Sequence, residues 1–426
     1  MNAKLKKAVL AAAILSTPFA VSAANLVGGG ASLPSVAYVG DGFTVLDPQA
    51  RLSSSVLFAG INPGTGIPYN QVTVDGTSIF GVYNQGANNA SYCQTGSSTG
   101  KRVLLSAADE IASGSCKDYS DSPDGFSGPN ALPDFAGSDA PLTAGDISKF
   151  IDPTDGYQSQ RTNLVQVPAL GAFLGLPVNI QDGSGNAITN VDLDTAEVCS
   201  VFDGSAKVWS DVGVSSSQQI KVVYRSDGSG TTFAFTQYLA ANCNIPATTF
   251  QTEELYSDAI SLGVYGGREV GGSGNGGVID AVTSTPGAIG YANFSNVAAE
   301  PGLAYALVEG HDPDNGGSIN VDPSDILIDI VLGDPDAVTG LPTTQSLASA
   351  GGTEVGCLAV VNPAIQLTQS YPIVAFTNLL TYTNSNPNAV AVEDLFDAVS
   401  DATGLPAGYA AIDSAVIDNI ISTCIN

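Results

Sequence analysis

Basic side chains are scarce in this sequence of 426 residues, which has 13 lysines and arginines against 41 aspartates and glutamates and a formal net charge of −28. Long-range repulsion from such an excess opposes binding to nucleic acid and to anionic membrane surfaces. We therefore expect neither as a partner. An anion bound by this chain has to be attracted by short-range, oriented donors.

Histidine is almost absent, since His311 in the polar turn "GHDPDNGG" is the only one. Residues 96–100 read "GSSTG" and satisfy the GxSxG pattern of hydrolase nucleophiles. A catalytic triad also needs a base, which this sequence scarcely offers, so we do not expect serine-hydrolase chemistry. The sequence has no CxxC pair and no His/Cys cluster that would indicate zinc. No metal and no cofactor is expected.

Long apolar runs are missing after the first residues, and none reaches the roughly 18 residues that a membrane span needs. Residues 1–23, "MNAKLKKAVLAAAILSTPFAVSA", carry lysines, then an apolar run, then a small-residue cleavage pattern. These features are typical of a secretory signal peptide. The first cysteine is Cys93, so no lipid-attachment cysteine follows this leader directly. We expect a periplasmic or secreted protein.

The cysteines are even in number, which in an exported chain favours disulfides. Their spacing favours pairing in sequential order, although the sequence leaves the other pairings open. The favoured pairs are Cys93 with Cys116, Cys199 with Cys243, and Cys357 with Cys424.

Apolar, strand-like runs alternate with helix-like runs along the chain, which favours an α/β protein. The strand-like runs include residues 164–180, 220–225, 287–294 and 371–380, and the helix-like runs include 232–243 and 392–399. The length predicts two domains, and the run at 164–180 is a candidate crossing between them. Glycine-, serine- and asparagine-rich stretches at 83–100, 113–130, 265–277 and 309–320 are predicted to be loops or insertions.

Four segments are rich in small residues and hydrogen-bond donors: "GGGASLP" (28–34), "QTGSSTGK" (94–101), "DFAGSDAPL" (134–142) and "YRSDGSGTTFAFTQYL" (224–239). In the last segment, a serine of the kind that caps helices precedes residues that can continue a helix. The free N–H groups and partial positive charge of such a helix start lie close in sequence to the guanidinium of Arg225. This combination predicts an anion site.

In this order, the four segments resemble those of the phosphate-binding proteins of bacterial phosphate ABC transporters. The resemblance covers most of the mature chain and includes residues 192–213, 274–295, 370–382 and 404–412. The stretches "AGSDAPLTA" and "YRSDGSGTT" are also similar to secreted DING proteins, although "ANLVGGGASLP" departs from their N-terminal Asp-Ile-Asn-Gly. The resemblance implies a two-lobed, type II periplasmic-binding-protein fold, with a mixed sheet flanked by helices in each lobe and the ligand in the interlobe cleft.

The implied partners are inorganic phosphate and, as a candidate, an ABC permease, and the implied state is a monomer. We expect the following boundaries: 1–23 signal peptide, 24–165 first part of lobe 1, 166–305 lobe 2, and 306–426 return to lobe 1 with an insertion near 309–355.

The resemblance also implies the phosphate ligands, which are Ser32, Leu33, Ser97, Asp139, Arg225, Ser229, Gly230 and Thr231, with Asp227 orienting the arginine. Arg225 offers two parallel, charge-assisted donors to an oxyanion. Asp139 is compatible with a ligand that brings a proton, as phosphate does and sulfate at neutral pH does not. The expected selectivity is therefore for phosphate over sulfate.

Simpler roles remain open for each residue taken alone. Arg225 and Asp227 could form an ordinary ion pair, Asp139 could cap a helix before Pro141, and Ser32 and Ser97 could be turn residues. Because no covalent chemistry is required, we expect a binding protein and not an enzyme. The alternatives are a secreted phosphatase on the same scaffold, and an extracellular surface or adhesive protein whose long insertions flank a relic site.

Overall fold

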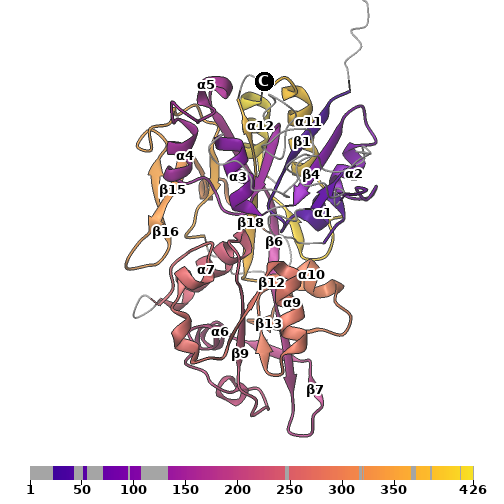
Figure 1. The fold of residues 1–426 in the computed structure, drawn as a ribbon, viewed down its shortest axis with the longest axis vertical. Helices are drawn as coiled ribbons and strands as arrows, with labels where there is room; N and C mark the ends of the chain where they lie inside the picture. The colour runs from indigo at the N-terminus through magenta and orange to yellow at the C-terminus, as the bar shows by residue number, and fades with distance from the viewer. Residues whose placement is uncertain are drawn as a thin grey trace, which may run out of the picture.

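The computed structural model describes residues 23–42, 51–54, 71–94, 96–106, 133–244, 249–315, 319, 321–365, 371–383, 386–412 and 414–425. Helices and strands alternate along these ranges, as the sequence predicts for an α/β protein. The strands form one large mixed sheet in the order β10-β9-β11-β6-β18-β5-β1-β4-β2-β3, with further strands paired to β6 and β13. Figure 1 shows an upper and a lower half stacked along the long axis, each with helices packed around its strands.

The first described residues of the chain form part of the upper half. Its elements are β1 (Asn25–Gly30), α1 (Ser35–Val39), β2 (Arg51–Ser53), β3 (Gln71–Val72), α2 (Ile79–Tyr83), β4 (Asn89–Gln94), α3 (Ser97–Leu105), β5 (Phe135–Ser138), α4 (Ala144–Phe150) and α5 (Gln158–Arg161). β1 lies between β4 and β5 and is parallel to both. The carboxyl ends of these three strands therefore meet at one edge.

Strand β6 (Leu164–Gln181) belongs to both halves. Within residues 164–173, every residue except Ala169 pairs with β18 (Val374–Tyr382) of the upper half, and the register shifts at Ala169. Its later residues pair with short strands of the lower half, from Leu174 opposite Asn293 to Gln181 opposite Ala187. Nearly every residue of β6 is buried, which explains why its sequence reads as a continuous apolar run and does not alternate.

The lower half follows β6 in the sequence. Its elements are β7 (Ala187–Ile188), β8 (Val191–Leu193), α6 (Thr195–Phe202), η2 (Trp209–Val212), β9 (Lys221–Arg225), α7 (Gly230–Cys243), α8 (Tyr256–Ala259), η3 (Leu262–Tyr265), β10 (Glu269–Gly272), α9 (Gly274–Ser284), β11 (Ala288–Ile289), β12 (Ala292–Asn293), α10 (Phe294–Ala299) and β13 (Ala304–Val308).

The chain then returns to the upper half (Figure 1). The remaining elements are η4 (Pro313–Asn315), η5 (Pro323–Asp325), β14 (Ile326–Ile328), β15 (Ile330–Pro335), β16 (Pro342–Ser346), β17 (Ala359–Val361), β18, α11 (Ala389–Ser400), β19 (Tyr409–Ala411) and α12 (Ala415–Cys424). None of the helices in the described ranges is long and apolar enough to cross a membrane.

Two stretches predicted to be loops are partly regular structure, so those predictions were wrong. Residues 83–100 contain β4 and the start of α3, and residues 265–277 contain β10 and the start of α9. Parallel pairing of β4 with β1 and of β10 with β9 outweighs the weak strand propensity of their small residues. Residues 309–320 carry only a short turn of helix in their described part, whereas residues 113–130 lie outside the described ranges.

Two of the predicted disulfides are confirmed. Cys199 of α6 is bonded to Cys243 at the end of α7, and Cys357 is bonded to Cys424 at the end of α12. Cys93 is disulfide-bonded as well, but its predicted partner Cys116 lies outside the described ranges. Residues 1–22 of the predicted leader also lie outside them.

Three glycines allow α3 to pack directly on the backbone of β1 and β5. A Cβ atom on Gly100 would lie 2.7 Å from the carbonyl oxygen of Gly137 and 2.7 Å from the Cα of Gly30. Gly30 itself has a φ of 132°, which disfavours any residue with a side chain. This close approach holds the first turn of α3, with Ser97, at the carboxyl ends of the strands.

We predict that Gly100→Ala lowers the free energy of unfolding by about 2 kcal/mol or more, because the added methyl group meets backbone atoms that cannot rotate away. The matched control is Gly145→Ala in α4, where the nearest atom to the new Cβ, Thr143 Oγ1, is 3.6 Å away. That control should be neutral or stabilising by roughly 0.5–1 kcal/mol. Guanidinium unfolding of the mature proteins measures both changes, and equal stabilities of the two variants would contradict the packing argument.

Candidate functional site

The four donor-rich segments all follow the carboxyl ends of strands. Residues 31–34 follow β1, Gly96 lies between β4 and α3, Asp139 follows β5, and residues 226–229 connect β9 to α7. In open α/β sheets, the carboxyl ends of strands are where ligands bind. Two backbone hydrogen bonds tie three of the segments together: Ala31 N donates to Gly137 O over 2.9 Å, and Gly96 N donates to Gly30 O over 2.8 Å.

The first turn of α7 lies directly against two predicted site residues of the upper half. A Cβ atom on Gly230 would be 2.3 Å from Asp139 Cβ and 2.7 Å from Ser97 Oγ. Ser229 caps the helix, because its hydroxyl oxygen accepts a hydrogen bond from Thr231 N over 3.1 Å. The predicted cap is therefore confirmed, and within the described ranges the Ser229 hydroxyl proton is donated to no other group.

Ser97 and Asp139 are joined by two hydrogen bonds. The Ser97 hydroxyl donates to Asp139 Oδ2 over 3.1 Å and accepts from Asp139 N over 3.0 Å. Asp139 is not a helix cap, since α4 begins after Thr143, whose hydroxyl oxygen accepts from Asp146 N. Both Ser97 and Asp139 are buried, with Asp139 only 4% exposed.

The Asp139 carboxyl group is unusual in its charge and its hydrogen bonding. Burial raises its pKa to about 7, against the lowering effects of the hydroxyls of Thr377 and Ser97 and of the Arg225 charge, while Glu254 raises it further. Its Oδ1 atom is buried and makes no hydrogen bond of normal geometry within the described part of the chain, and neither does the Thr377 hydroxyl near it. A carboxyl group with these properties can accept or donate a proton near neutral pH.

Arg225 ends β9, is 3% exposed, and is held by two side chains. Its Nε donates to Asp227 Oδ1 over 2.8 Å, its Nη2 contacts Asp227 Oδ2, and its Nη1 donates to Asn275 Oδ1 over 3.3 Å. Asp227 Oδ1 also accepts from Gly274 N over 3.0 Å. Desolvation opposes ionisation of Asp227, yet its bonds to Arg225 and Gly274 N keep its pKa below the usual value.

Arg225 and Asp227 form the ion pair that the sequence left open, but these contacts do not use all the N–H donors of the guanidinium. Guanidinium carries five N–H donors, of which these contacts engage three. Since the Arg225 charge also acts on Asp139, the two side chains lie within electrostatic reach of each other across the two halves.

The first segment joins this group through a chain of polar contacts. The carbonyl oxygen of Leu33 accepts from Asn293 Nδ2 over 2.8 Å and from the Tyr409 hydroxyl. Asn293 N donates to Asn275 Oδ1 over 3.3 Å, the same oxygen that accepts from Arg225. Ser32 lies beside Leu33 and is also buried. Ser97, Asp139 and Gly230 are therefore in direct contact, whereas Leu33, next to Ser32, is connected to Arg225 through Asn293 and Asn275.

Sequence reasoning missed several residues that this arrangement uses, namely Asn275, Asn293, Thr377, Lys101 and Glu254. Asn275 stands in "GNGG" at the start of α9, where a small polar residue among glycines gives a weak signal. Glu254 lies between α7 and α8 in a segment with no motif. Only the folded chain brings it to Ser98 and Lys101.

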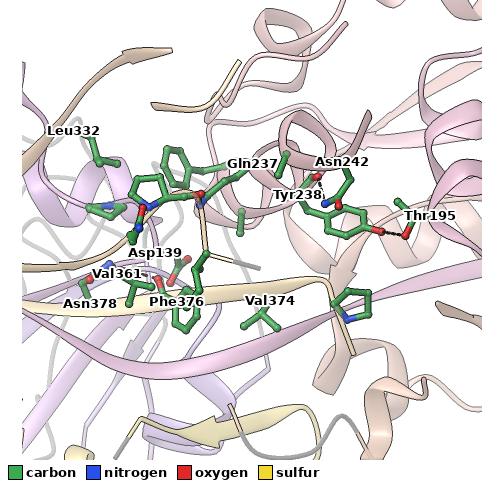
Figure 2. A pocket seen from close by; sticks show the side chains of 18 of the residues that line it. Asp139, Thr195, Gln237, Tyr238, Asn242, Leu332, Val361, Val374, Phe376 and Asn378 are labelled. Atoms are coloured by element: carbon green, nitrogen blue, oxygen red, sulfur yellow. Dashed lines mark hydrogen bonds between the residues drawn. The ribbon is translucent and has the colours of Figure 1, made fainter. Parts of the chain in front are cut away.

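A cavity of about 400 Å³ lies on another side of Asp139 (Figure 2). Figure 2 shows Asp139 near Phe376 at one part of it, and Tyr238 with Thr195 at the far part. Ser97, Arg225 and Gly230 do not line this cavity. Within the described ranges, no group of three or more His, Cys, Asp or Glu side chains is arranged to hold a metal ion.

Comparison with known proteins places the chain in a family. The family model described as a PBP superfamily domain matches residues 68–401. A phosphate-binding protein from an unknown prokaryotic organism is 31% identical over 270 residues, covering 58% of this chain and 65% of that protein. Alkaline phosphatase L of Pseudomonas aeruginosa strain UCBPP-PA14 is 30% identical over 327 residues, covering 72% of this chain and 73% of that protein. The chain thus spans slightly less than two thirds of the first relative and more than two thirds of the second.

Solved structures confirm the predicted fold class. A high affinity periplasmic phosphate-binding protein, PfluDING, bound with phosphate, matches with a TM-score of 0.57 at 22% identity and covers 93% of each chain. A phosphate binding protein from Stenotrophomonas maltophilia matches with a TM-score of 0.55 at 20% identity, covering 94% of this chain and 93% of that one. Since the family model spans well over half of the sequence, the chain belongs to the PBP (periplasmic-binding-protein) superfamily.

Proposed function

We propose that this chain is an exported substrate-binding protein that captures inorganic phosphate between two lobes and delivers it to an ABC permease. The proposal takes residues 24–165 and 306–426 as one lobe and 166–305 as the other, with residues 1–23 as a cleaved leader. The observation that carries it is the buried Asp139, whose Oδ1 lacks a hydrogen-bond partner in the described structure, while Ser97 and Gly230 contact this residue and the Arg225 charge acts on it. The names of the phosphate-binding relatives support the same ligand.

In this proposal, the positive charge comes from Arg225 and the remaining donors are neutral. The guanidinium, oriented by Asp227, offers charge-assisted hydrogen bonds to two phosphate oxygens. The start of α7 offers the Ser229 and Thr231 hydroxyls and the Gly230 N–H, together with the partial positive charge of the helix terminus. The further donors are the Ser32 hydroxyl, the Leu33 N–H and the Ser97 hydroxyl, whose proton would turn from Asp139 Oδ2 to the ligand.

Asp139 provides selectivity in this proposal. Phosphate keeps at least one proton near pH 7 and can donate it to the open Oδ1 atom, which removes the charge repulsion. Sulfate has no such proton, so it would face the ionised carboxylate as a like charge and an unpaired acceptor, and the selectivity against it should increase as the pH rises above the Asp139 pKa of about 7. Mismatches of this kind discriminate between ligands by roughly 10⁴-fold.

A second candidate function is phosphomonoester hydrolysis. The cavity of about 400 Å³ beside Asp139 has room for the organic part of an ester, and the P. aeruginosa relative is named as an alkaline phosphatase. Hydrolysis of p-nitrophenyl phosphate that is abolished by Asp139→Asn would support it. The insertions invoked for the adhesive alternative lie largely outside the described ranges, so that alternative stays a prediction.

The central test is calorimetric titration of the mature protein, stripped of ligand by unfolding and refolding, with phosphate and then sulfate at pH 7. We expect one-to-one phosphate binding and sulfate binding weaker by roughly 10⁴-fold. Arg225→Ala should weaken phosphate binding by about 2–5 kcal/mol, as expected for removing a buried charge partner. Lys221→Ala, which removes a positive charge at the other end of β9, is the control. Equal losses in both variants, or a folded, ligand-free protein that binds no phosphate, would refute the proposal.

Gly230→Ala tests whether the lobes close on this site. The new methyl group would lie 2.3 Å from Asp139 Cβ, so we expect phosphate affinity to fall roughly 10- to 100-fold, because overpacking costs about 1–3 kcal/mol. Gly228→Ala is the matched control, since the nearest atom to its Cβ, Ser98 Oγ, is 3.9 Å away. Calorimetry measures both, with thermal unfolding of the apo forms as a check on folding. Unchanged binding by Gly230→Ala would disprove this contact in the bound state.

The raised pKa of Asp139 predicts a pH dependence of stability without ligand. Between its ordinary pKa of 3.8 and the folded value of about 7, the native state binds more protons than the unfolded state. The free energy of unfolding therefore falls as pH rises through this window and levels off above it. The asparagine side chain of Asp139→Asn does not ionise, so the variant does not lose stability in this way. Its free energy of unfolding relative to that of the wild type should rise by up to roughly 4 kcal/mol from pH 4 to pH 8. Urea unfolding in phosphate-free buffers measures the difference, and a gap that does not change with pH would show that the pKa is not raised.

A further inference from the structure

Glu254 connects the two halves beside the proposed phosphate site. It lies in the lower half, between α7 and α8. Its carboxylate is held by two side chains of α3 in the upper half: Lys101 Nζ lies 3.2 Å from Oε1, and the Ser98 hydroxyl donates to Oε2. Ser98 and Lys101 follow Ser97 on the helix that faces Asp139.

The backbone around Glu254 is attached to the start of α7. The Glu254 carbonyl oxygen accepts from Ser229 N over 2.9 Å. The Thr236 hydroxyl accepts from Glu253 N over 3.0 Å and lies 3.1 Å from Glu253 O, to which it donates. Ser229 caps α7, so the position of Glu254 affects the helix start that carries Gly230 and Thr231.

The charges around Lys101 make this contact reversible. Lys101 is only 7% exposed at its side chain and also pairs with Asp146 of α4 over 3.3 Å. Burial works against its charge, but Glu254 and Asp146 together raise its pKa. If the halves separate, Lys101 keeps Asp146 from its own half, while the Glu254 side chain, already 24% exposed, returns to water. Opening therefore leaves no buried charge unpaired.

We propose that Glu254, Ser98 and Lys101 form an interlobe latch that stabilises the closed state and slows the release of phosphate. This inference rests on the proposed phosphate-binding function and assigns Glu254 a positioning role, since it acts through Ser229 and α3. The latch forms only after the lobes have met, so it affects the dissociation rate and leaves the association rate nearly unchanged.

The test is the release of radiolabelled phosphate from the mature protein, chased with excess unlabelled phosphate, together with the association rate. Glu254→Gln keeps the shape of the side chain and removes its charge, and it should speed release about tenfold, as expected for the loss of a charge-assisted contact. Glu253→Gln makes the same charge change one residue away and should release phosphate at the wild-type rate. Ser98→Ala should also speed release, and combining it with Glu254→Gln should give less than the product of the two single effects.

Wild-type release by Glu254→Gln, or equal acceleration by Glu253→Gln, would overturn the latch while leaving phosphate binding intact. A wild-type protein that binds no phosphate would instead refute the proposed function. The latch is then tested by small-angle X-ray scattering of the ligand-free proteins. A larger radius of gyration for Glu254→Gln than for Glu253→Gln supports it, and equal radii overturn it.

Discussion

Asp139 is buried against Ser97 of its own half and Gly230 of the other half, and this contact joins the two halves at the candidate site. It requires that residue 230 have no side chain, that α3 approach the strands closely enough to place Ser97, and that β5 end at Ser138. A buried carboxyl group with an open oxygen is unfavourable by itself. Its presence where the two halves meet is explained if a ligand that brings both negative charge and a proton completes the site.

The strongly acidic composition and the proposed anion site are compatible because the basic groups at the site are enclosed. Arg225 is contacted by Asp227, and Lys101 by Glu254 and Asp146. Each of these two cations is therefore matched within a few ångströms by carboxylates and adds little to the field far from the protein. Attraction of an anion then depends on oriented donors at contact distance, where dissolved salt screens poorly.

The sequence predicted those parts of the fold and site that depend on local chemistry. The cap at Ser229, the apolar run of β6 and two disulfides follow from neighbouring residues and spacing. The sequence did not predict β4 and β10, because pairing with parallel neighbours stabilises these strands more than their own residues do. Glu254 could not be found, because Lys101 is 153 residues away in sequence. A single sequence contains no signal for such a contact.

The strand shared by both halves has a consequence for how the chain can fold. Among the described strands, β6 is connected to the β5-β1-β4 strands of the upper half through β18, which lies between β6 and β5. A sheet that begins at Asn25 is therefore joined to β6 by residues 374–382, and the last strand to pair in it is β19, close to the end of this sequence. The upper half cannot assemble its sheet during synthesis or export until almost the whole chain has emerged. The lower half, which is continuous in sequence between β6 and β13, has its strands available much earlier.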